Sequence, residues 1–568
     1  MRRCLLILLF AILFLPQGGW AQEKSDDVRL RQIVREYGQA EVTVPYPGSV
    51  TIDKLTKNVS ILSVKEKSVF ISLSPLTVEW FILQGFNYSI LAKNVTKGII
   101  SAESMADAME WDKYPTYTQY DSIMQSFNSL YPTLCDLDTI GTSVNGKLVL
   151  VLKISDNPDS NEDEPEVFYS STMHGDETGG FILMLRLADY LLKNYNADSR
   201  IRNLVNNLEI WINPLANPDG TYRSGNVISS ATSTRYNANG VDLNRNFPDP
   251  LVPSIVPMKE NIDMIAFLRK HKFVISANFH SGAEVVNYPW DRYLSKLHAD
   301  DSWFYSISRA YADTVHLYSS PYYMNFMDNG ITRGAVWYRI EGGRQDFVTS
   351  YLQGREVTIE LDDYFITPVA QLSLLWQNNY RSLLAYIRNA LYGIHGIVTN
   401  VTNSAPVAAR VFISGHDTDS SHVYSDEAYG SFYRYLAPGS WNLTFSSPGY
   451  EEETVSNVLV VDGQRTELTV SLTPVVNRID TTNPDVPVLY PNPASSEVKA
   501  VIPDILLGDL NIRIFNASGV KVFEYQTTAF KGLPVIIELN GLAAGSYHVL
   551  LSNPKRTITS RARFVVIK

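Results

Sequence analysis

Cysteine is scarce in this chain, which has two in 568 residues. Cys4 lies in the apolar start of the chain, so a chain processed beyond that point keeps only Cys135. A single thiol cannot form an internal disulfide, and we therefore expect stability to come from packing or from bound ions. Nothing around Cys135 indicates a nucleophile, and we expect a small, buried, apolar role for it.

An excess of basic charge is also lacking, since the formal net charge is -11. This balance argues against a nucleic-acid partner and suits a soluble protein whose substrates are cationic. After the first residues no apolar run is long enough to span a bilayer, so we expect no transmembrane segment. The start itself has Arg2-Arg3, an apolar run from Leu5 to Leu15 and small residues to Ala21. This pattern predicts a signal peptide over residues 1–21 and therefore secretion.

The length of the chain exceeds what one hydrophobic core supports, which predicts several domains. In the middle of the chain, over residues 108–392, short apolar runs alternate with helical patterns. The alternation predicts an α/β domain with a mostly parallel mixed sheet and helices on both faces. The strands are expected at Val167–Thr172, Leu208–Ile212, Phe273–Phe279 and Val357–Leu361, and the helices at Gly179–Tyr195, Glu260–His271 and Leu374–Leu391.

The segment Met173-His174-Gly175-Asp176-Glu177 sets an imidazole and a carboxylate three residues apart, directly after a predicted strand. His280 follows another predicted strand, and ligands gather at the carboxyl ends of parallel strands. Two histidines and one carboxylate are a normal protein shell for catalytic Zn²⁺. A lone His-x-x-Glu also arises by chance, and the chain has nine histidines.

Further motifs follow in a fixed order: Asn217-Pro218-Asp219-Gly220, Gly240-Val241-Asp242-Leu243-Asn244-Arg245-Asn246-Phe247-Pro248-Asp249 and Thr358-Ile359-Glu360-Leu361. With the histidine motifs they resemble the zinc carboxypeptidases of the M14 family, over roughly Trp111 to Tyr392. The resemblance implies that His174, Glu177 and His280 hold one Zn²⁺. It also implies that Glu360 is the general base for the attacking water.

The same resemblance assigns roles to substrate-binding residues. Arg235 matches the arginine that hydrogen-bonds the scissile carbonyl. Asn244 and Arg245 match the pair that grips the terminal carboxylate, for which a guanidinium fork is well suited. Tyr338 matches a mobile tyrosine that closes over the substrate. Ordinary loop positions are the alternative for Arg235 and Tyr338.

Within the family the chain resembles the regulatory, or N/E, branch. Asp291, in Asn287-Tyr288-Pro289-Trp290-Asp291, falls where that branch keeps an acid facing the last side chain of the substrate. Gln345 matches another position of the same pocket and is uncharged. We therefore expect a preference for C-terminal Lys or Arg, carried by Asp291 alone. The alternative for Asp291 is a surface-loop acid.

The flanking segments predict four further parts of the chain. Residues 22–107 look similar to prosegments of small α+β fold, and either an inhibitory or a permanent accessory role is open. Residues 393–475 resemble a transthyretin-like β-sandwich, and residues 476–487 form a linker. Residues 488–568, which open Tyr490-Pro491-Asn492-Pro493, resemble the sorting domain of type IX secretion cargo in Gram-negative bacteria. A generic binding sandwich is the alternative for this last part.

The sequence thus predicts a secreted or surface-attached zinc metallocarboxypeptidase that acts on peptide and protein C-termini, with the bacterial secretion machinery as a partner. One alternative is an M14 peptidase acting on cell-wall peptides or on other C-terminal residues. The other is a peptide-binding module without catalysis. A site of two histidines and one carboxylate accepts other divalent ions as well, and the family resemblance favours zinc.

Overall fold

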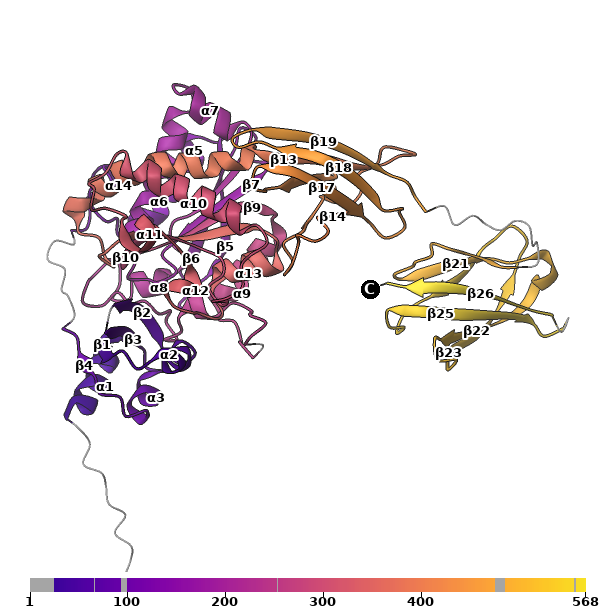
Figure 1. Cartoon of the computed structure of the whole chain (residues 1–568), viewed down its shortest axis with the longest axis horizontal. Helices are drawn as coiled ribbons and strands as arrows, with labels where there is room; N and C mark the ends of the chain where they lie inside the picture. The colour runs from indigo at the N-terminus through magenta and orange to yellow at the C-terminus, as the bar shows by residue number, and fades with distance from the viewer. Residues whose placement is uncertain are drawn as a thin grey trace, which may run out of the picture.

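The computed structural model describes residues 25–65, 67–92, 100–252, 254–475, 486–555 and 558–567. Four folded regions follow one another along the chain, from indigo at the start to yellow at the end (Figure 1). The expected signal peptide and most of the expected linker lie outside the described residues. Among the residues described, no helix has both the length and the apolar character that a membrane crossing requires.

An eight-stranded mixed sheet forms the core of the central domain, in the order β11-β10-β12-β9-β7-β8-β6-β5. The pairs β10–β11, β12–β9, β9–β7 and β7–β8 are parallel, and the other three pairs are antiparallel. The mixed, mostly parallel sheet is therefore confirmed. Its strands are β5 (Cys135–Thr142), β6 (Leu148–Ile154), β7 (Glu166–Ser171), β8 (Glu209–Asn213), β9 (Phe273–His280), β10 (Ala283–Tyr288), β11 (Ile331–Arg333) and β12 (Arg355–Asp362).

Helices cover both faces of this sheet. Successive strand residues point to opposite faces, and buried residues on both faces each need a covering layer. Tyr169 packs in the core on the side of α5, α6, α10 and α14, whereas its neighbour Phe168 packs with α9 and α13. The helix expected from Leu374 begins earlier, at Val369, directly after Pro368, which suits a helix start. The helices of this domain are α4 (Met105–Ala108), α5 (Tyr117–Leu130), α6 (Gly179–Asn194), α7 (Ser199–Val205), α8 (Pro218–Thr221), α9 (Lys259–Lys270), α10 (Asp301–His316), α11 (Phe326–Asn329), α12 (Gly334–Trp337), α13 (Arg344–Tyr351) and α14 (Val369–Arg388).

The N-terminal module is a separate α+β unit with its own apolar core. Its sheet has the order β2-β3-β1-β4. Figure 1 shows this indigo module against the central domain, with β2 nearest to it. Its elements are α1 (Ser25–Tyr37), β1 (Ala40–Pro45), α2 (Ser49–Thr56), β2 (Ser60–Lys65), β3 (Ser68–Leu73), α3 (Val78–Leu83) and β4 (Ser89–Ile90).

Two β-sandwiches follow the central domain, as expected, and each has a separate core. The first pairs sheets β16-β13-β19 and β15-β14-β17-β18, and the second pairs β20-β21-β24 and β23-β22-β25-β26. The strands of the first are β13 (Gly393–Asn400), β14 (Arg410–Phe412), β15 (Val423–Tyr424), β16 (Ser431–Arg434), β17 (Gly439–Ser446), β18 (Glu453–Val460) and β19 (Arg465–Leu472). Those of the second are β20 (Val488–Tyr490), β21 (Glu497–Val501), β22 (Gly508–Asn516), β23 (Lys521–Ala529), β24 (Val535–Glu538), β25 (Gly545–Asn553) and β26 (Ile558–Val566).

A buried ion cluster joins the central domain to the first sandwich. Asp300, directly before α10, pairs with Arg355 of β12 at 2.6 Å and with Arg434 of β16 at 2.7 Å. The three side chains are at most 1% exposed. The two guanidinium groups hold the pKa of Asp300 well below its usual value, against the effect of burial.

Cys135 lies in β5, where its thiol is buried and free. Burial raises the pKa of this thiol to about 12, so the reactive thiolate is scarce at neutral pH. The expected packing role of Cys135 fits this position.

Candidate active site

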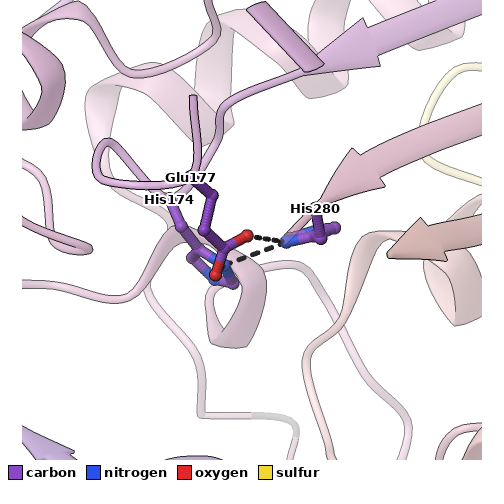
Figure 2. A group of neighbouring side chains, drawn as sticks. All are labelled: His174, Glu177 and His280. Carbon is purple, nitrogen blue, oxygen red and sulfur yellow. Dashed lines mark hydrogen bonds and ion pairs between the residues drawn. The ribbon is translucent and has the colours of Figure 1, made fainter. Parts of the chain in front are cut away.

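The three expected metal ligands meet at the carboxyl edge of the central sheet (Figure 2). His174 and Glu177 lie in the loop after β7, in a turn where the Glu177 amide donates to the His174 carbonyl at 3.1 Å. His280 is the last residue of β9, which pairs with β7 in parallel. Because neighbouring parallel strands end at the same edge, residues a hundred positions apart come together there.

The donor atoms of these side chains surround one point. Glu177 Oε1 lies 2.8 Å from His174 Nδ1, and Glu177 Oε2 lies 2.7 Å from His280 Nδ1. The two Nδ1 atoms are 2.9 Å apart, and all three residues are buried. Burial lowers the pKa of His280 to about 4, so its imidazole is neutral at pH 7 and can donate a lone pair. Two nitrogen donors and a carboxylate in this arrangement fit Zn²⁺.

Asp242 orients two groups of the site at once. Its Oδ1 lies 3.0 Å from Nε2 of His174, on the side of the ring that faces away from Glu177. Its Oδ2 accepts a hydrogen bond from Nε of Arg235 at 2.9 Å. Arg235 and His174 hold the pKa of Asp242 well below its usual value although burial opposes this. Such an outer carboxylate fixes the tautomer and orientation of a metal-binding histidine.

Sequence reasoning assigned no role to Asp242. It lies in the Gly240–Asp249 motif, two residues before Asn244. This position within the motif is the feature of the sequence that could have pointed to a role for Asp242.

Arg235 is buried, in contrast to an ordinary loop cation. Besides Asp242 it contacts a metal ligand, because its Nη1 donates to Glu177 Oε1 at 3.1 Å. The guanidinium therefore lies at the wall of the metal site.

Glu360 lies on β12 beside the metal ligands. β12 pairs with β9 in parallel, and the register sets Glu360 opposite His280. Oε2 of Glu360 is shielded from solvent and has no hydrogen-bond partner within the described chain. Burial and the nearby Glu177 raise the pKa of Glu360 well above its usual value. An acid in this setting is suited to taking up a proton.

Asn244 and Arg245 form the next part of the wall. Asp242 caps their turn by accepting from the Asn244 amide at 2.9 Å. Nη1 of Arg245 donates to the Asn244 carbonyl at 2.9 Å. Nε and Nη2 of Arg245 are buried and find no acceptor among the residues described. Two unpaired N–H groups on one edge of a guanidinium are what a bidentate carboxylate needs.

Asp291 and Tyr338 line one pocket together with the metal ligands. Asn287 donates to Asp291 Oδ1 at 3.0 Å, and a Cβ at Gly334 would lie only 1.7 Å from that oxygen. Asp291 is buried rather than a surface-loop acid. Burial, and then the nearby Asp346, raise its pKa to about 8.

Gln345 departs from the expectation. It is buried in the first turn of α13 and is not among the residues that line the pocket. Its side-chain amide has no hydrogen-bond partner among the described residues. The neighbouring Asp346 instead supports Asp291, because it accepts a hydrogen bond from the Asp291 amide at 3.0 Å. Adjacent helix residues point in different directions, so a match in sequence did not place Gln345 at the pocket wall.

The N-terminal module also reaches the site, which the sequence did not predict in detail. Leu62 of β2 lines the pocket of the metal ligands. Ser60 Oγ donates to Asp242 Oδ2 at 2.6 Å. Gln39 Oε1 accepts from the backbone N–H of Arg235 at 2.8 Å, and its Nε2 donates to Asp176 at 2.9 Å. Tyr338 packs against the core of the module.

Comparison with known proteins gives matches along the chain. Family models described as zinc carboxypeptidase, carboxypeptidase regulatory-like domain and secretion system C-terminal sorting domain match residues 120–382, 393–473 and 488–567. Carboxypeptidase D of Anas platyrhynchos is 32% identical over 461 residues, which are 76% of this chain and 32% of that protein. This chain thus spans about a third of that relative. The sorting-domain match implies secretion or a location at the cell surface.

Shorter relatives are covered more fully. Carboxypeptidase SOL1 of Arabidopsis thaliana is 32% identical over 65% of this chain and 74% of its own length. The carboxypeptidase N catalytic chain of Mus musculus is 31% identical over 60% of this chain and 82% of its own length. These matches confirm the predicted family, its branch and the families of the two C-terminal modules. The chain therefore belongs to the M14 zinc carboxypeptidase family, in its regulatory branch.

Proposed function

We propose that this protein removes Lys or Arg from the C-termini of peptides and proteins, with one Zn²⁺ held by His174, Glu177 and His280. The observation that carries this proposal is the pairing of charges in one pocket. Arg245 offers two N–H groups that have no acceptor among the described residues, and the Asp291 carboxyl lies in the same pocket. A C-terminal basic residue has a carboxylate for the first group and a cation for the second.

The chemistry follows from the positions of the side chains. Asn244 and Arg245 hold the terminal carboxylate, and this orients the last peptide bond toward the metal ligands. Bound Zn²⁺ would polarise the scissile carbonyl and make water acidic enough to attack at neutral pH. Arg235 donates to the carbonyl oxygen as negative charge develops on it. Glu360 takes a proton from the attacking water and passes it to the leaving amine, while Tyr338 covers the bound residue.

The direct test is hydrolysis of blocked dipeptides that end in Arg, Lys, Phe, Leu or Glu, with and without a chelator. We expect chelator-sensitive release of Arg and Lys. Asp291→Asn should lower kcat/KM for the Arg substrate by about 100-fold, because a desolvated charge pair is lost. Asp363→Asn, an exposed acid outside the pocket, is the matched control. Release of apolar residues by the wild type would refute the basic preference but keep the reaction.

The two alternative functions have their own outcome in this test. An enzyme for cell-wall peptides would leave all five dipeptides intact and cleave muropeptides. A binding module would cleave neither the dipeptides nor the muropeptides. It would bind a basic peptide equally well in the wild type and in the Glu360→Gln variant. For the proposed enzyme, Glu360→Gln should lower kcat by orders of magnitude and leave peptide binding intact.

We also propose that the N-terminal module, residues 22–107, keeps the enzyme latent rather than serving as an accessory domain. Support comes from Leu62 in the pocket and from the contacts of Gln39 and Ser60 with Arg235 and Asp242. A module in this position competes with substrate for the space above the metal. Activation would then follow cleavage near Lys97 to Trp111, a stretch that falls partly outside the residues that the structure describes.

Removal of two ion pairs in the intact chain tests latency. Asp53 pairs with Arg339 at 3.1 Å and Lys57 with Glu341 at 3.5 Å, both in the loop that follows Tyr338. Asp53→Ala with Lys57→Ala removes both attractions without offering new partners to Arg339 and Glu341, which lie 3.3 Å from each other, and should raise activity on the Arg dipeptide several-fold. Lys54→Ala, on the same helix but bonded within the module, is the control. Unchanged or lower activity in the double variant would favour an accessory role.

For the C-terminal module we propose delivery across the outer membrane of a Gram-negative bacterium. The support is the match to a secretion sorting domain over residues 488–567. A chain that ends at residue 487, produced in a bacterium with this secretion system, should accumulate in the periplasm. Equal export of both chains would contradict the proposal.

A further inference from the structure

A buried arginine directly follows the acid of the substrate pocket. Arg292 comes after Asp291 in the loop behind β10, and its side chain is only 3% exposed. Two aromatic rings flank its guanidinium, since Cζ lies 4.8 Å from the centre of the Trp290 ring and 5.1 Å from that of Tyr293. If this cation paired with Asp291, it would neutralise the charge that attracts a basic substrate. The ion pairs of Arg292 in the described chain lead to two other acids instead.

These two acids hold the Arg292 guanidinium from two neighbouring segments. Oδ2 of Asp249 lies 3.5 Å from Nη1, and Oδ2 of Asp346, in the first turn of α13, lies 3.6 Å from Nε. Both acids are buried. Asp346 also clamps the backbone, because it accepts from the amides of Asp291 and Arg292 at 3.0 Å each. One carboxylate thus fixes both the loop and the direction of its cation.

The Asp291 side chain is left without a paired cation. Its Oδ1 accepts a hydrogen bond from the neutral Asn287 at 3.0 Å, and no cation of the described chain forms an ion pair with it. Burial, and then the charge of Asp346, raise the pKa of Asp291 to about 8, although Asn287, Arg245 and Arg292 act in the opposite direction. The charged or titratable groups that face this carboxyl are Asp346, Arg245, Arg292, Tyr338 and Glu360. A bound cation is the partner that this acid lacks.

We propose that Asp346, together with Asp249, is a positioning residue that holds Arg292 away from Asp291 and so keeps Asp291 available to a basic C-terminal side chain. This inference rests on the proposed preference for Lys and Arg and adds the residues that maintain it. Nε and Nη1 of Arg292 make no hydrogen bond within the described chain, so charge alone directs them. Without the charge of Asp346, these N–H groups would turn to the neighbouring carboxylate of Asp291.

The test compares blocked dipeptides that end in Arg or in its neutral isostere citrulline, with the whole zinc-loaded chain at pH 9, where Asp291 is largely ionised. Asp346→Asn should lower the Arg-to-citrulline ratio of kcat/KM by about tenfold and change the citrulline value less than about twofold. Adding Arg292→Gln should restore the ratio to within about threefold of the wild type, because the released cation is gone. Asp189→Asn is the control, since Asp189 is a buried acid that pairs with Lys193 outside the pocket.

The rescue by the second substitution separates the proposed role from a merely structural one. Equal losses for both dipeptides in Asp346→Asn would overturn the inference, and so would an unchanged ratio or a double variant no better than the single one. If Asp346→Asn does not fold, Asp249→Asn with and without Arg292→Gln gives the same comparison, and a ratio that does not fall and recover refutes the inference. A wild type that treats both dipeptides alike would refute the basic preference itself, and this inference with it.

Discussion

Asp242→Asn tests whether one carboxylate holds both the metal ligand and the arginine of the active site. Asp242 uses Oδ1 toward His174 Nε2 at 3.0 Å and Oδ2 toward Arg235 Nε at 2.9 Å. An asparagine of the same shape keeps one acceptor oxygen, and its amide must then face the N–H of either His174 or Arg235. In one of the two contacts, two N–H donors then face each other, which is unfavourable. The negative charge of the carboxylate is lost as well.

The expected magnitudes follow from these two contacts. Loss of an outer carboxylate typically weakens metal binding by about 10- to 100-fold. Displacement of the Arg235 donor adds a loss of about 100-fold or more in kcat. Zinc Kd is measured by competition with a chromogenic chelator, and kcat/KM with the Arg dipeptide. Asp249→Asn is the control for zinc Kd, since Asp249 is a buried acid of the same motif that bonds the Gly342 amide instead. An unchanged zinc Kd in Asp242→Asn would refute the reasoning.

Three further predictions concern the substrate pocket. Arg245→Lys keeps the charge but loses the fork of N–H groups, so KM for all carboxylate-ended substrates should rise by about tenfold or more, while an amidated peptide should bind equally well to both forms. Gly334→Ala should lower kcat/KM for the Arg dipeptide by about tenfold and that for Leu far less, because the added Cβ meets Asp291 Oδ1 at 1.7 Å; equal losses would contradict this. Since the pKa of Asp291 is raised to about 8, the free carboxyl is largely protonated at pH 7 and a bound cation must displace the proton. KM for an Arg dipeptide relative to its citrulline analogue should therefore fall as pH rises from 6 to 9, and a flat ratio would show that Asp291 does not titrate there.

The fold of the central domain was predictable because its strands are short apolar runs that end in polar motifs. His174, Glu177 and His280 could be placed at one edge because each follows a predicted strand. The role of Asp242 could not be read in the same way, since its contact with His174 joins residues 68 positions apart across a loop. Leu62 was beyond reach for a similar reason, because no pattern in a separate module says which surface it covers.

The buried cluster of Asp300, Arg355 and Arg434 makes the sequence boundary after residue 392 a poor place to divide the protein. A recombinant fragment that stops there keeps Asp300 and Arg355 but removes Arg434, the second cation of the cluster. The same cut exposes to solvent polar groups that are buried in the intact chain. β12 carries Arg355 at one end and Glu360, the proposed base, near the other. Loss of the Arg434 partner therefore perturbs the strand that holds the base. The two domains thus share a buried ion cluster, and fragments made for enzymology should run through residue 475.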